Sequence, residues 1–352
     1  MKCHCYTDWE ALPASANRLF EEAEKESAFF SRQWFESLIN TSLSDDQELK
    51  LVCVEDGQDC LAILPLVAQS ATTWVSLRHR YTPHFSLLLA DRDREQTLAC
   101  LARGLRDLAV KGILLEPVAD DDEKLVWLEQ ALSREGFVCD RLFRHYNWIY
   151  TVQGRDYSEY LAQRPTRLRN TLQRKRRKLA REHEYKIRLF SGEQVLPKMQ
   201  DYYRVYRDSW KADEQYRELV DDMIARFSSA GWTRLGILYI EGRPAAAQLW
   251  FVCHGKASIF RLSYDEAWKM YSPGSILMAY LMEFVIDTEK VEEVDFLTGN
   301  DSYKQDWMSE RREQQALCCV RQTSERMGLV ARIDSIWRTL RNNFINKRMN
   351  DR

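Results

Sequence analysis

The chain has 352 residues, of which 45% are hydrophobic and 30% are charged. This composition is typical of globular proteins and excludes a disordered chain, a collagen and a coiled coil. Lys and Arg total 51 against 53 Asp and Glu, a net charge of −2, so no overall basic excess points to nucleic acid.

The first residues carry no export signal. Met1–Tyr6 lacks the apolar segment of a signal peptide, and no run of about 18 apolar residues exists elsewhere. With an odd cysteine count of nine, this predicts a cytoplasmic protein with free thiols. Cys3-His4-Cys5 is spaced too closely for a zinc site, so no metal is expected.

The first half is predicted to alternate helices and strands. Apolar spacing predicts helices over Ala14–Lys25 and Phe29–Ile39. Strands over Leu49–Glu55 and Cys60–Val67 form a hairpin around the Asp56-Gly57 turn. The next elements are strands over Trp74–Leu77, Phe85–Leu89, Gly112–Pro117, Phe137–Asp140 and Trp148–Val152, with helices over Glu95–Ala109 and Asp122–Glu135. The loop Tyr81–Phe85 is placed to line a groove.

A basic segment joins the two halves. Its cations are Arg164, Arg167, Arg169, Arg174, Lys175, Arg176, Arg177, Lys178 and Arg181. Leu161, Leu168, Leu172 and Leu179 form one narrow apolar stripe, which predicts a helix with a cationic outer face. Three interpretations remain: a solvated helix at the domain junction, a wall of a cleft for an anionic ligand, or a nucleic-acid surface.

The second half repeats the order of elements in the first. Helices are predicted over Leu196–Trp210, Tyr216–Ser229 and Ser275–Thr288, and strands over Leu235–Glu241, Ala245–Cys253, Ala257–Tyr264, Glu293–Phe296 and Gln315–Arg321. An offset of 185 residues relates the hairpin turns at Gly57 and Gly242 and the closing residues Val67 and Val252. We therefore expect a tandem repeat of one α/β fold, although any two hairpins share this general pattern.

The tail carries a second basic amphipathic pattern. Val330, Ile333, Trp337, Leu340 and Phe344 follow helical spacing among several Arg and Lys residues. Such a helix docks on its own protein or lies on a membrane surface, which leaves peripheral membrane contact open.

The segment before the helix at Ser275 has the features of an anion site. Pro273 fixes its φ angle, and Gly274 allows close approach of a ligand. The first N–H groups of the helix lack intrahelical partners, which suits a pyrophosphate. An ordinary turn with a helix cap has the same pattern.

The order of motifs from Ala257 to Trp307 resembles the GNAT acyltransferase superfamily. It comprises a strand, Tyr264-Asp265, Ser272-Pro273-Gly274, a helix, Asp295-Phe296 and Tyr303-Lys304-x-x-Trp307. With Phe29–Phe35 and Arg167–Asn170, it looks more closely like the CelD-type branch, which is often linked to cellulose or exopolysaccharide production. That branch is similar to the Fem-type peptidoglycan aminoacyltransferases, which carry two GNAT-like domains.

The resemblance implies an α/β (α+β) fold of tandem GNAT-like domains, each a mixed, mostly antiparallel sheet flanked by helices. The predicted units are a first domain (1–155), a basic connecting helix (156–185), an acyltransferase domain (186–325) and a basic tail helix (326–352). The first domain has no counterpart of Ser272–Gly274, so we expect it to lack a CoA site.

Acetyl-CoA or another acyl-CoA is the implied co-substrate. Its pyrophosphate falls on Tyr271, Ser272, Pro273, Gly274, Ser275 and Ile276. The commoner family form, Gln/Arg-x-x-Gly-x-Gly/Ala, is replaced here by Pro273-Gly274.

The family reacts by direct attack of an amine or hydroxyl on the thioester, with a general base and a general acid. Asp265 follows a strand and is a candidate base, or an exposed turn residue. Asp295 lies in a strand and needs a buried partner, either Lys304 or Arg261, so a catalytic and a structural role are both open.

Two further groups complete the predicted chemistry. Tyr303 is the candidate acid that protonates the leaving thiolate, unless it packs on Trp307. Lys304 is a candidate to stabilise the thioester oxyanion or an anionic acceptor.

The acceptor is expected to be a sugar, a sugar nucleotide or another small anionic molecule, contacted by Arg169, Arg261 and Trp307. No DNA partner is expected. Two alternatives stay open: a Fem-type transferase that uses aminoacyl-tRNA, and a non-catalytic scaffold in exopolysaccharide biosynthesis.

Overall fold

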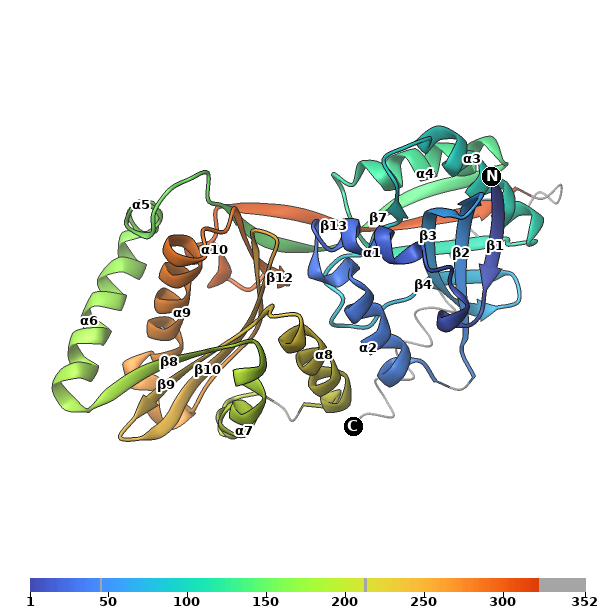
Figure 1. Cartoon of the computed structure of the whole chain (residues 1–352). Helices are drawn as coiled ribbons and strands as arrows, with labels where there is room; N and C mark the ends of the chain where they lie inside the picture. The colour runs from blue at the N-terminus through green and yellow to red at the C-terminus, as the bar shows by residue number, and fades with distance from the viewer. Residues whose placement is uncertain (45, 212–213, 323–352) are drawn as a thin grey trace.

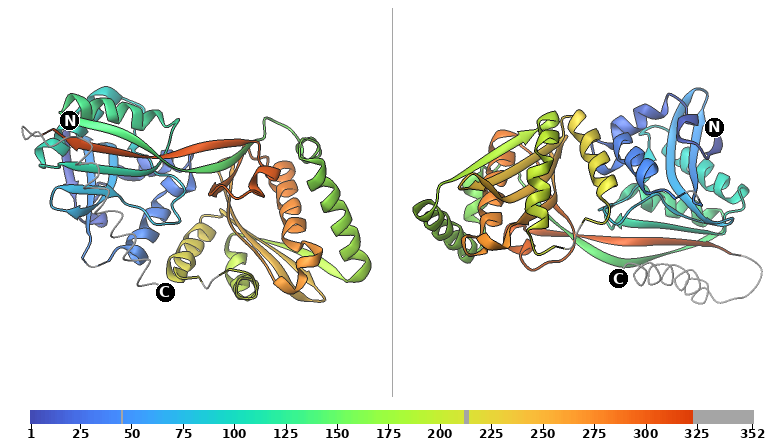
Figure 2. Two further views of the ribbon diagram at one scale, coloured as in Figure 1. Left: turned by 180° about the vertical axis from the view of Figure 1, so that it is seen from behind. Right: turned by 90° about the horizontal axis from the view of Figure 1, so that it is seen from below.

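The computed structural model describes residues 1–44, 46–211 and 214–322, and the predicted tail helix lies outside these residues. Two lobes are joined by a long two-stranded ribbon (Figures 1 and 2). The strands of the first lobe are β1 (Lys2–Tyr6), β2 (Glu48–Asp56), β3 (Asp59–Ser70), β4 (Thr73–Ser76), β5 (Leu88–Leu89) and β6 (Gly112–Ala119). Those of the second lobe are β8 (Tyr185–Ser191), β9 (Thr233–Ile240), β10 (Arg243–Cys253), β11 (Lys256–Tyr264) and β12 (Glu293–Thr298). The ribbon consists of β7 (Phe137–Thr151) and β13 (Glu310–Arg321).

The sheet has the same strand order when it is followed inward from either edge. The order is β1-β2-β3-β4-β6-β13-β7-β12-β11-β10-β9-β8, with β5 paired to β3. In each lobe the outer strands pair antiparallel, and one parallel pair follows, β4 with β6 or β11 with β12. The hairpins related by the 185-residue offset, β2-β3 and β9-β10, hold equivalent places. Each lobe is therefore a mixed, mostly antiparallel sheet flanked by helices, which confirms the predicted fold class.

The two lobes exchange their last strands. β7 belongs in sequence to the first lobe, yet it pairs with β12 of the second. β13 belongs in sequence to the second lobe and pairs with β6 of the first. The two exchanged strands also pair with each other from Glu310 opposite Ile149 to Arg321 opposite Phe137. Because the β13-β7 ribbon pairs with β6 on one side and with β12 on the other, the lobes share one continuous sheet.

The ribbon corrects two expectations. Phe137–Asp140 and Trp148–Val152 were predicted as separate strands, but β7 is continuous from Phe137 to Thr151 because β13 pairs with it from Phe137 to Ile149. The nine cysteines were expected as free thiols, whereas Cys139 and Cys319 lie opposite each other on the ribbon and form a disulfide. The remaining seven cysteines are free.

Helices cover both lobes. In the first lobe they are α1 (Ala16–Ala23), α2 (Arg32–Ser42), α3 (Arg94–Asp107) and α4 (Glu123–Arg134). In the second they are α5 (Tyr157–Ala162), α6 (Thr166–Glu182), α7 (Met199–Arg207), α8 (Arg217–Ser229), α9 (Pro273–Glu283) and α10 (Lys304–Trp307). The short helical turns are η1 (Trp9–Ala11), η2 (Ala28–Phe30), η3 (Gly192–Lys198), η4 (Glu266–Tyr271) and the π-turn η5 (Phe284–Thr288). Among the described residues, no helix combines the length and apolar character needed to cross a bilayer.

Local chemistry decides where several helices begin. The predicted helix Phe29–Ile39 is divided because Ser31 adopts an extended backbone and its hydroxyl accepts a hydrogen bond from the Trp34 N–H, so α2 starts there. The predicted basic helix is divided at Pro165, which begins α6. Leu168, Leu172 and Leu179 of its apolar stripe are buried.

The first strand of each lobe, β1 and β8, was not predicted. Both are edge strands whose side chains alternate between exposed and half-buried over most of their length. The alternation of Cys3 and Cys5 with Lys2 and His4 is the signal for β1.

Gly104 on α3 marks a close approach between that helix and β1. A Cβ atom at this position would lie 2.1 Å from Cys3 Sγ and 2.5 Å from Cys3 Cβ. Gly104→Ala should therefore lower the free energy of unfolding by about 1–3 kcal/mol, measured by urea denaturation. Cys3→Gly removes both clashing atoms, so Gly104→Ala should cost much less in that background. An equal cost in both backgrounds would contradict the contact.

Candidate functional site

A cavity of about 440 Å³ opens where β11 and β12 separate. The two strands pair in parallel only through Lys256–Ser258 and Glu293–Asp295. Past this point both strands are irregular. β11 has a bulge at Phe260, which has no pairing partner on β10, and β12 turns at Leu297, which has a φ angle of +54°. Such bulges bend strands and re-aim side chains next to functional sites. The lining residues are Ile259, Phe260, Arg261, Leu262, Phe296, Leu297, Thr298, Arg80, Tyr81, Trp210, Lys211, Asp301, Tyr303 and Lys304.

The first lobe closes one side of this cavity. Arg80 and Tyr81, from the loop after β4, reach across the junction of the lobes. The Tyr81 hydroxyl donates a hydrogen bond to Glu214, and Arg80 Nη1 donates to Gln215 Oε1 at 3.4 Å. The loop Tyr81–Phe85 was expected to line a groove, and Tyr81 does so. The cavity is therefore formed by both lobes.

Arg261 and Glu214 form an ion pair at the cavity wall. Arg261 Nη2 lies 2.8 Å from Glu214 Oε2, and the Glu214 side chain is only 4% exposed. The guanidinium also stacks over the Tyr81 ring, 4.2 Å from its centroid. Because the Glu214 carboxylate is buried away from water, its ion pair with Arg261 is the main interaction that stabilises its negative charge.

The lining is predominantly cationic. Arg80, Lys211, Arg261 and Lys304 contribute positive side chains, against Asp301 in the lining itself. Burial, together with the nearby Arg261 charge, lowers the pKa of Lys211 to about 8. A cationic cavity attracts anionic ligands, and an amine with a pKa near 8 exchanges protons readily close to neutral pH.

Lys304 holds the turned end of β12. Its Nζ donates to three main-chain carbonyls: Phe296 at 3.0 Å, Leu297 at 3.4 Å and Thr298 at 2.7 Å. Burial lowers the pKa of this amine. Since an ammonium group has three donors, this geometry gives Lys304 a positioning role. Its contact with a reacting group stays a prediction.

Asp295 lies behind the same turn. It is 5% exposed, and its Oδ1 accepts a hydrogen bond from the Leu297 N–H at 2.6 Å. Burial raises its pKa to about 7, with a smaller contribution from the Glu293 charge. A carboxyl group with this pKa is suited to proton transfer at neutral pH. However, Asp295 is not among the lining residues and adjoins the cavity through Leu297.

Tyr303 lines the cavity and is 42% exposed. Its ring packs on the edge of Phe296, with centroids 5.6 Å apart. Burial, with the Asp301 carboxylate, raises the pKa of its hydroxyl, so the side chain keeps its proton at neutral pH. Trp307, the alternative packing partner, is instead buried, and its carbonyl accepts a hydrogen bond from the Tyr160 hydroxyl at 2.8 Å.

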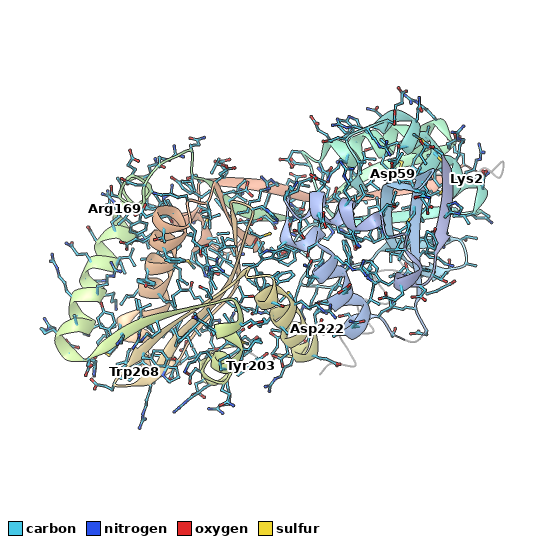
Figure 3. The ribbon with its side chains drawn as sticks, viewed as in Figure 1. Lys2, Asp59, Arg169, Tyr203, Asp222 and Trp268 are labelled. Atoms are coloured by element: carbon cyan, nitrogen blue, oxygen red, sulfur yellow. A yellow bond between two sulfur atoms is a disulfide. The ribbon has the colours of Figure 1, made fainter. Side chains whose placement is uncertain are left out.

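Three predicted site residues lie away from this cavity. Asp265 begins η4, and its carboxylate accepts a hydrogen bond from the Ala267 N–H at 2.9 Å. Trp307 is 4% exposed in the core of the second lobe. Arg169 is on the exposed face of α6, where it donates to Thr166 Oγ1 at 3.2 Å (Figure 3). The structure thus brings Arg261, Tyr303 and Lys304 together and leaves these three outside.

The predicted pyrophosphate segment forms the start of α9. Of its first amides, Ser275 N–H and Ile276 N–H both donate to the Ser272 carbonyl, at 3.1 and 3.2 Å. A Cβ atom on Gly274 would lie 3.2 Å from the Tyr264 ring, so packing alone accounts for glycine there. The segment is not part of the cavity lining.

The basic helix α6 lies beside this segment. Lys175 donates to the Met270 carbonyl, and Lys178 Nζ lies 5.2 Å from the centroid of the Tyr271 ring. The Tyr271 hydroxyl donates to Glu182 Oε2 at 3.0 Å. Two lysines therefore place positive charge next to the start of α9, which suits an anion. Binding of a cofactor by Tyr271–Ile276 stays a prediction.

The equivalent opening in the first lobe is bridged. Past the parallel pair of β4 and β6, Ser76 Oγ donates to the Glu116 carbonyl at 2.8 Å and accepts from the Glu116 N–H at 3.2 Å. Arg78 and Arg144 both form ion pairs with the Glu116 carboxylate. Within the described residues, no group of three or more His, Cys, Asp or Glu side chains is placed to hold a metal ion.

Comparisons with known proteins agree with this architecture. Residues 166–305 match the family described as the Acetyltransferase (GNAT) domain. A structure of FemX, 9% identical, has a TM-score of 0.62 and covers 90% of this chain and 97% of that one. A conserved protein of unknown function from Bacteroides thetaiotaomicron VPI-5482 is 11% identical, with a TM-score of 0.55 and coverages of 90% and 99%.

A third structure is the C-terminal DUF2156 domain of an Agrobacterium fabrum protein described as a lysylphosphatidylglycerol synthetase. It is 12% identical, has a TM-score of 0.53 and covers 87% of this chain and 93% of that one. At these identities the likeness establishes the fold alone. No curated protein sequence matches the chain.

Proposed function

We propose that this chain, with a GNAT fold in each lobe, is an acyltransferase whose second lobe performs the transfer. The observation that carries the proposal is the cationic cavity at the separated ends of β11 and β12. This cavity contains Tyr303, and all of its second-lobe lining lies within residues 166–305, which match the acetyltransferase family. The equivalent opening of the first lobe is filled by the Arg78–Glu116–Arg144 ion pairs. The first lobe therefore contributes a wall of the acceptor site through Arg80 and Tyr81.

The proposed reaction is direct transfer from an acyl-CoA such as acetyl-CoA. An acceptor amine or hydroxyl attacks the thioester carbonyl, a base takes the acceptor proton, and the thiolate leaves and is protonated. Tyr303 is the proposed acid because it lines the cavity and holds its proton at neutral pH. Lys211 is the proposed base because, unlike Asp265 and Asp295, it lines the cavity, and its pKa is about 8.

An anionic acceptor fits this cavity best. The positive charges of Arg80, Lys211 and Arg261 favour a phosphorylated sugar or a sugar nucleotide over a neutral or cationic acceptor. This chemistry agrees with the resemblance to the CelD-type branch, and a place in exopolysaccharide or cellulose production is part of the proposal. The positive charge of Lys211 is lost as the pH rises through about 8, so acceptor binding should weaken there.

Donor binding separates this proposal from its main alternative. Acetyl-CoA should bind the purified chain and release free thiol in the presence of UDP-linked amino sugars. A Fem-type donor, aminoacyl-tRNA, would instead bind with an affinity that falls steeply with salt, through cations such as those of α6. Binding of aminoacyl-tRNA with no binding of acetyl-CoA would overturn the acyl-CoA donor.

Tyr303→Phe tests the acid. We expect kcat to fall by about 10²-fold, because the thiolate then leaves without a proton donor, while the affinity for acetyl-CoA stays within about twofold. The control is Tyr239→Phe, which removes a hydroxyl that donates to Asp201 Oδ2 at 2.7 Å elsewhere in the lobe. Equal rates for wild type and Tyr303→Phe would remove Tyr303 from the chemistry.

A further inference from the structure

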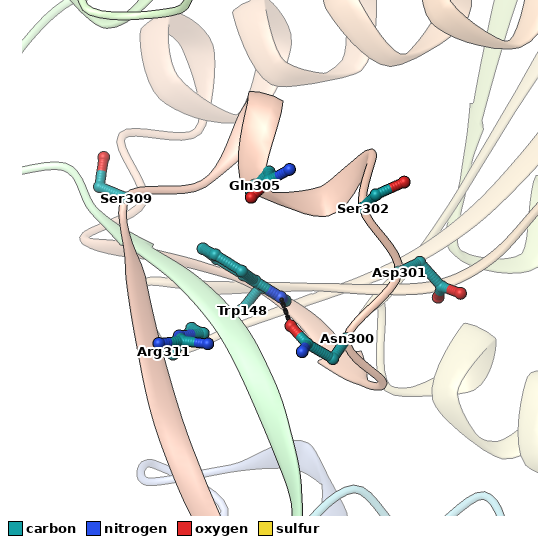
Figure 4. A pocket seen from close by; sticks show the side chains of 7 residues that line it. All are labelled: Trp148, Asn300, Asp301, Ser302, Gln305, Ser309 and Arg311. Atoms are coloured by element: carbon teal, nitrogen blue, oxygen red, sulfur yellow. Dashed lines mark hydrogen bonds between the residues drawn. The ribbon is translucent and has the colours of Figure 1, made fainter.

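We propose that a second cavity, around Trp148, binds a neutral, hydroxyl-rich saccharide. This cavity has a volume of about 530 Å³, within the usual range for small-molecule sites. Trp148 of β7 stands among Asn300–Ser302, Gln305 of α10, and Ser309 and Arg311 around the start of β13 (Figure 4). Because β7 comes from the first lobe in sequence, the cavity exists only through the strand exchange.

The indole of Trp148 provides the one aromatic surface of this lining. Its Nε1 donates to Asn300 Oδ1 at 2.9 Å, which fixes the orientation of the ring (Figure 4). Trp148 is half-buried, and the Arg311 guanidinium lies 5.5 Å from the ring centroid. A fixed aromatic ring with a polar rim suits a ligand that has both an apolar face and polar edges. A pyranose ring has this character, since its C–H groups gather on one face.

The rest of the lining consists of polar groups. The side chains of Ser302 and Gln305 make no hydrogen bond to any part of the chain that the structure describes, and both are exposed. Hydroxyl and amide side chains both donate and accept, as sugar hydroxyls do. An apolar acyl chain would leave these groups unsatisfied, so the lining disfavours it.

The charge of the cavity selects a neutral ligand. Asp301 and Arg311 contribute one charge of each sign. The cavity between β11 and β12 has four cations instead. A phosphate or carboxylate therefore favours the cationic cavity, and an uncharged saccharide favours the cavity around Trp148.

The two cavities meet at Asp301, which lines both. The loop Asn300–Tyr303 separates them, so a ligand held on Trp148 has a short path across the loop to Tyr303. We infer that the Trp148 cavity holds the saccharide part of an acceptor whose reacting end lies in the cationic cavity. This second step rests on the proposed function, whereas saccharide binding does not.

The test is calorimetric titration of the full chain with cellotriose and chitotriose, with saturation-transfer NMR to identify the sugar protons near the indole. Trp148→Ala should weaken binding about tenfold or more, and Gln305→Ala about threefold. Trp127→Ala is the matched control, because Trp127 is a half-buried surface tryptophan on α4 of the first lobe. Its affinity should equal that of the wild type.

Several outcomes would overturn the site: no binding of either trisaccharide, equal loss in Trp127→Ala, or unchanged affinity in both Trp148→Ala and Gln305→Ala. If Trp148→Ala fails to fold, Gln305→Ala and the NMR contacts decide the question. Saccharide binding without thiol release from acetyl-CoA would retain the site and contradict the proposed function. If thiol is released at the same rate in Trp148→Ala and Gln305→Ala and no saccharide binds, the proposed function would be retained and the saccharide site contradicted.

Discussion

Replacing Arg261 by methionine is expected to lower the free energy of unfolding by about 3–5 kcal/mol, because Glu214 would keep its charge in a buried place without its partner. The same variant should lose affinity for anionic acceptors, since Arg261 lines the cationic cavity. Urea denaturation measures the first effect, and titration with a sugar nucleotide measures the second. Methionine keeps much of the side-chain volume, so a void contributes little.

A double variant separates the two effects. In Arg261→Met/Glu214→Gln no buried charge is left alone, so most of the stability should return while anion binding stays lost. Arg134→Met is the control: its ion pair with Glu95 is exposed on both sides, and the stability should change by less than about 0.5 kcal/mol. If Arg261→Met were as stable as Arg134→Met, the buried pair would contribute nothing.

The local features of the fold were predictable from the sequence. Asp56-Gly57 and Glu241-Gly242 each precede an apolar run, and both places hold the hairpins that were expected. The offset between these turns predicted the repeat, because a repeated unit conserves the spacing of its turns. Elements that depend on turns and short-range periodicity can therefore be predicted from the sequence of this chain.

The strand exchange depends on contacts that local sequence does not encode. Arg141–Asn147 is mostly polar and mostly half-buried, without the regular alternation of a strand, so its pattern does not predict that β7 continues. What holds this stretch in a strand is β13, which is about 170 residues away in sequence and pairs with it along its length. Pairing at this distance places Cys139 opposite Cys319, and thiols that were expected to be free become a disulfide.

The candidate site divides in the same way. Arg261 and Tyr303 could be predicted from the sequence because both lie near recognisable motifs. Arg261 belongs to β11, which precedes the motif loop before α9, and Tyr303 follows β12. Lys211 and Glu214 were not assigned to the site, and Tyr81 was expected only to line a groove, since the packing of the two lobes is what brings these three residues together. The sequence carries no local signal for a lysine whose pKa is lowered by burial.

Asp295→Asn is expected to raise the stability of the chain at pH 8 and to leave it unchanged near pH 4. The native pKa of Asp295 is about 7, above its ordinary value of 3.8, because the carboxyl group is buried. Between these two values the native state binds a proton that the unfolded state has lost, so stability falls as the pH rises from about 4 to 7. Asparagine does not ionise and still accepts from the Leu297 N–H, so it avoids a cost of about 4 kcal/mol above pH 7.

Urea denaturation of both proteins at pH 4 and pH 8 checks this result, with Asp91→Asn as the control because that side chain is 97% exposed. A stability difference that is equal at both pH values would mean that Asp295 does not hold a proton in the native state.

The rate of transfer distinguishes the two predicted roles of Asp295, which are a catalytic base and a structural carboxyl group. If Asp295 is the base, Asp295→Asn removes the rise of kcat around pH 7; if Lys211 is the base, the rise lies near pH 8 and survives the substitution. A rise of kcat that stays near pH 8 in Asp295→Asn would support Lys211 as the base and leave Asp295 the structural role of accepting from the Leu297 N–H, which makes the pH profile the decisive measurement.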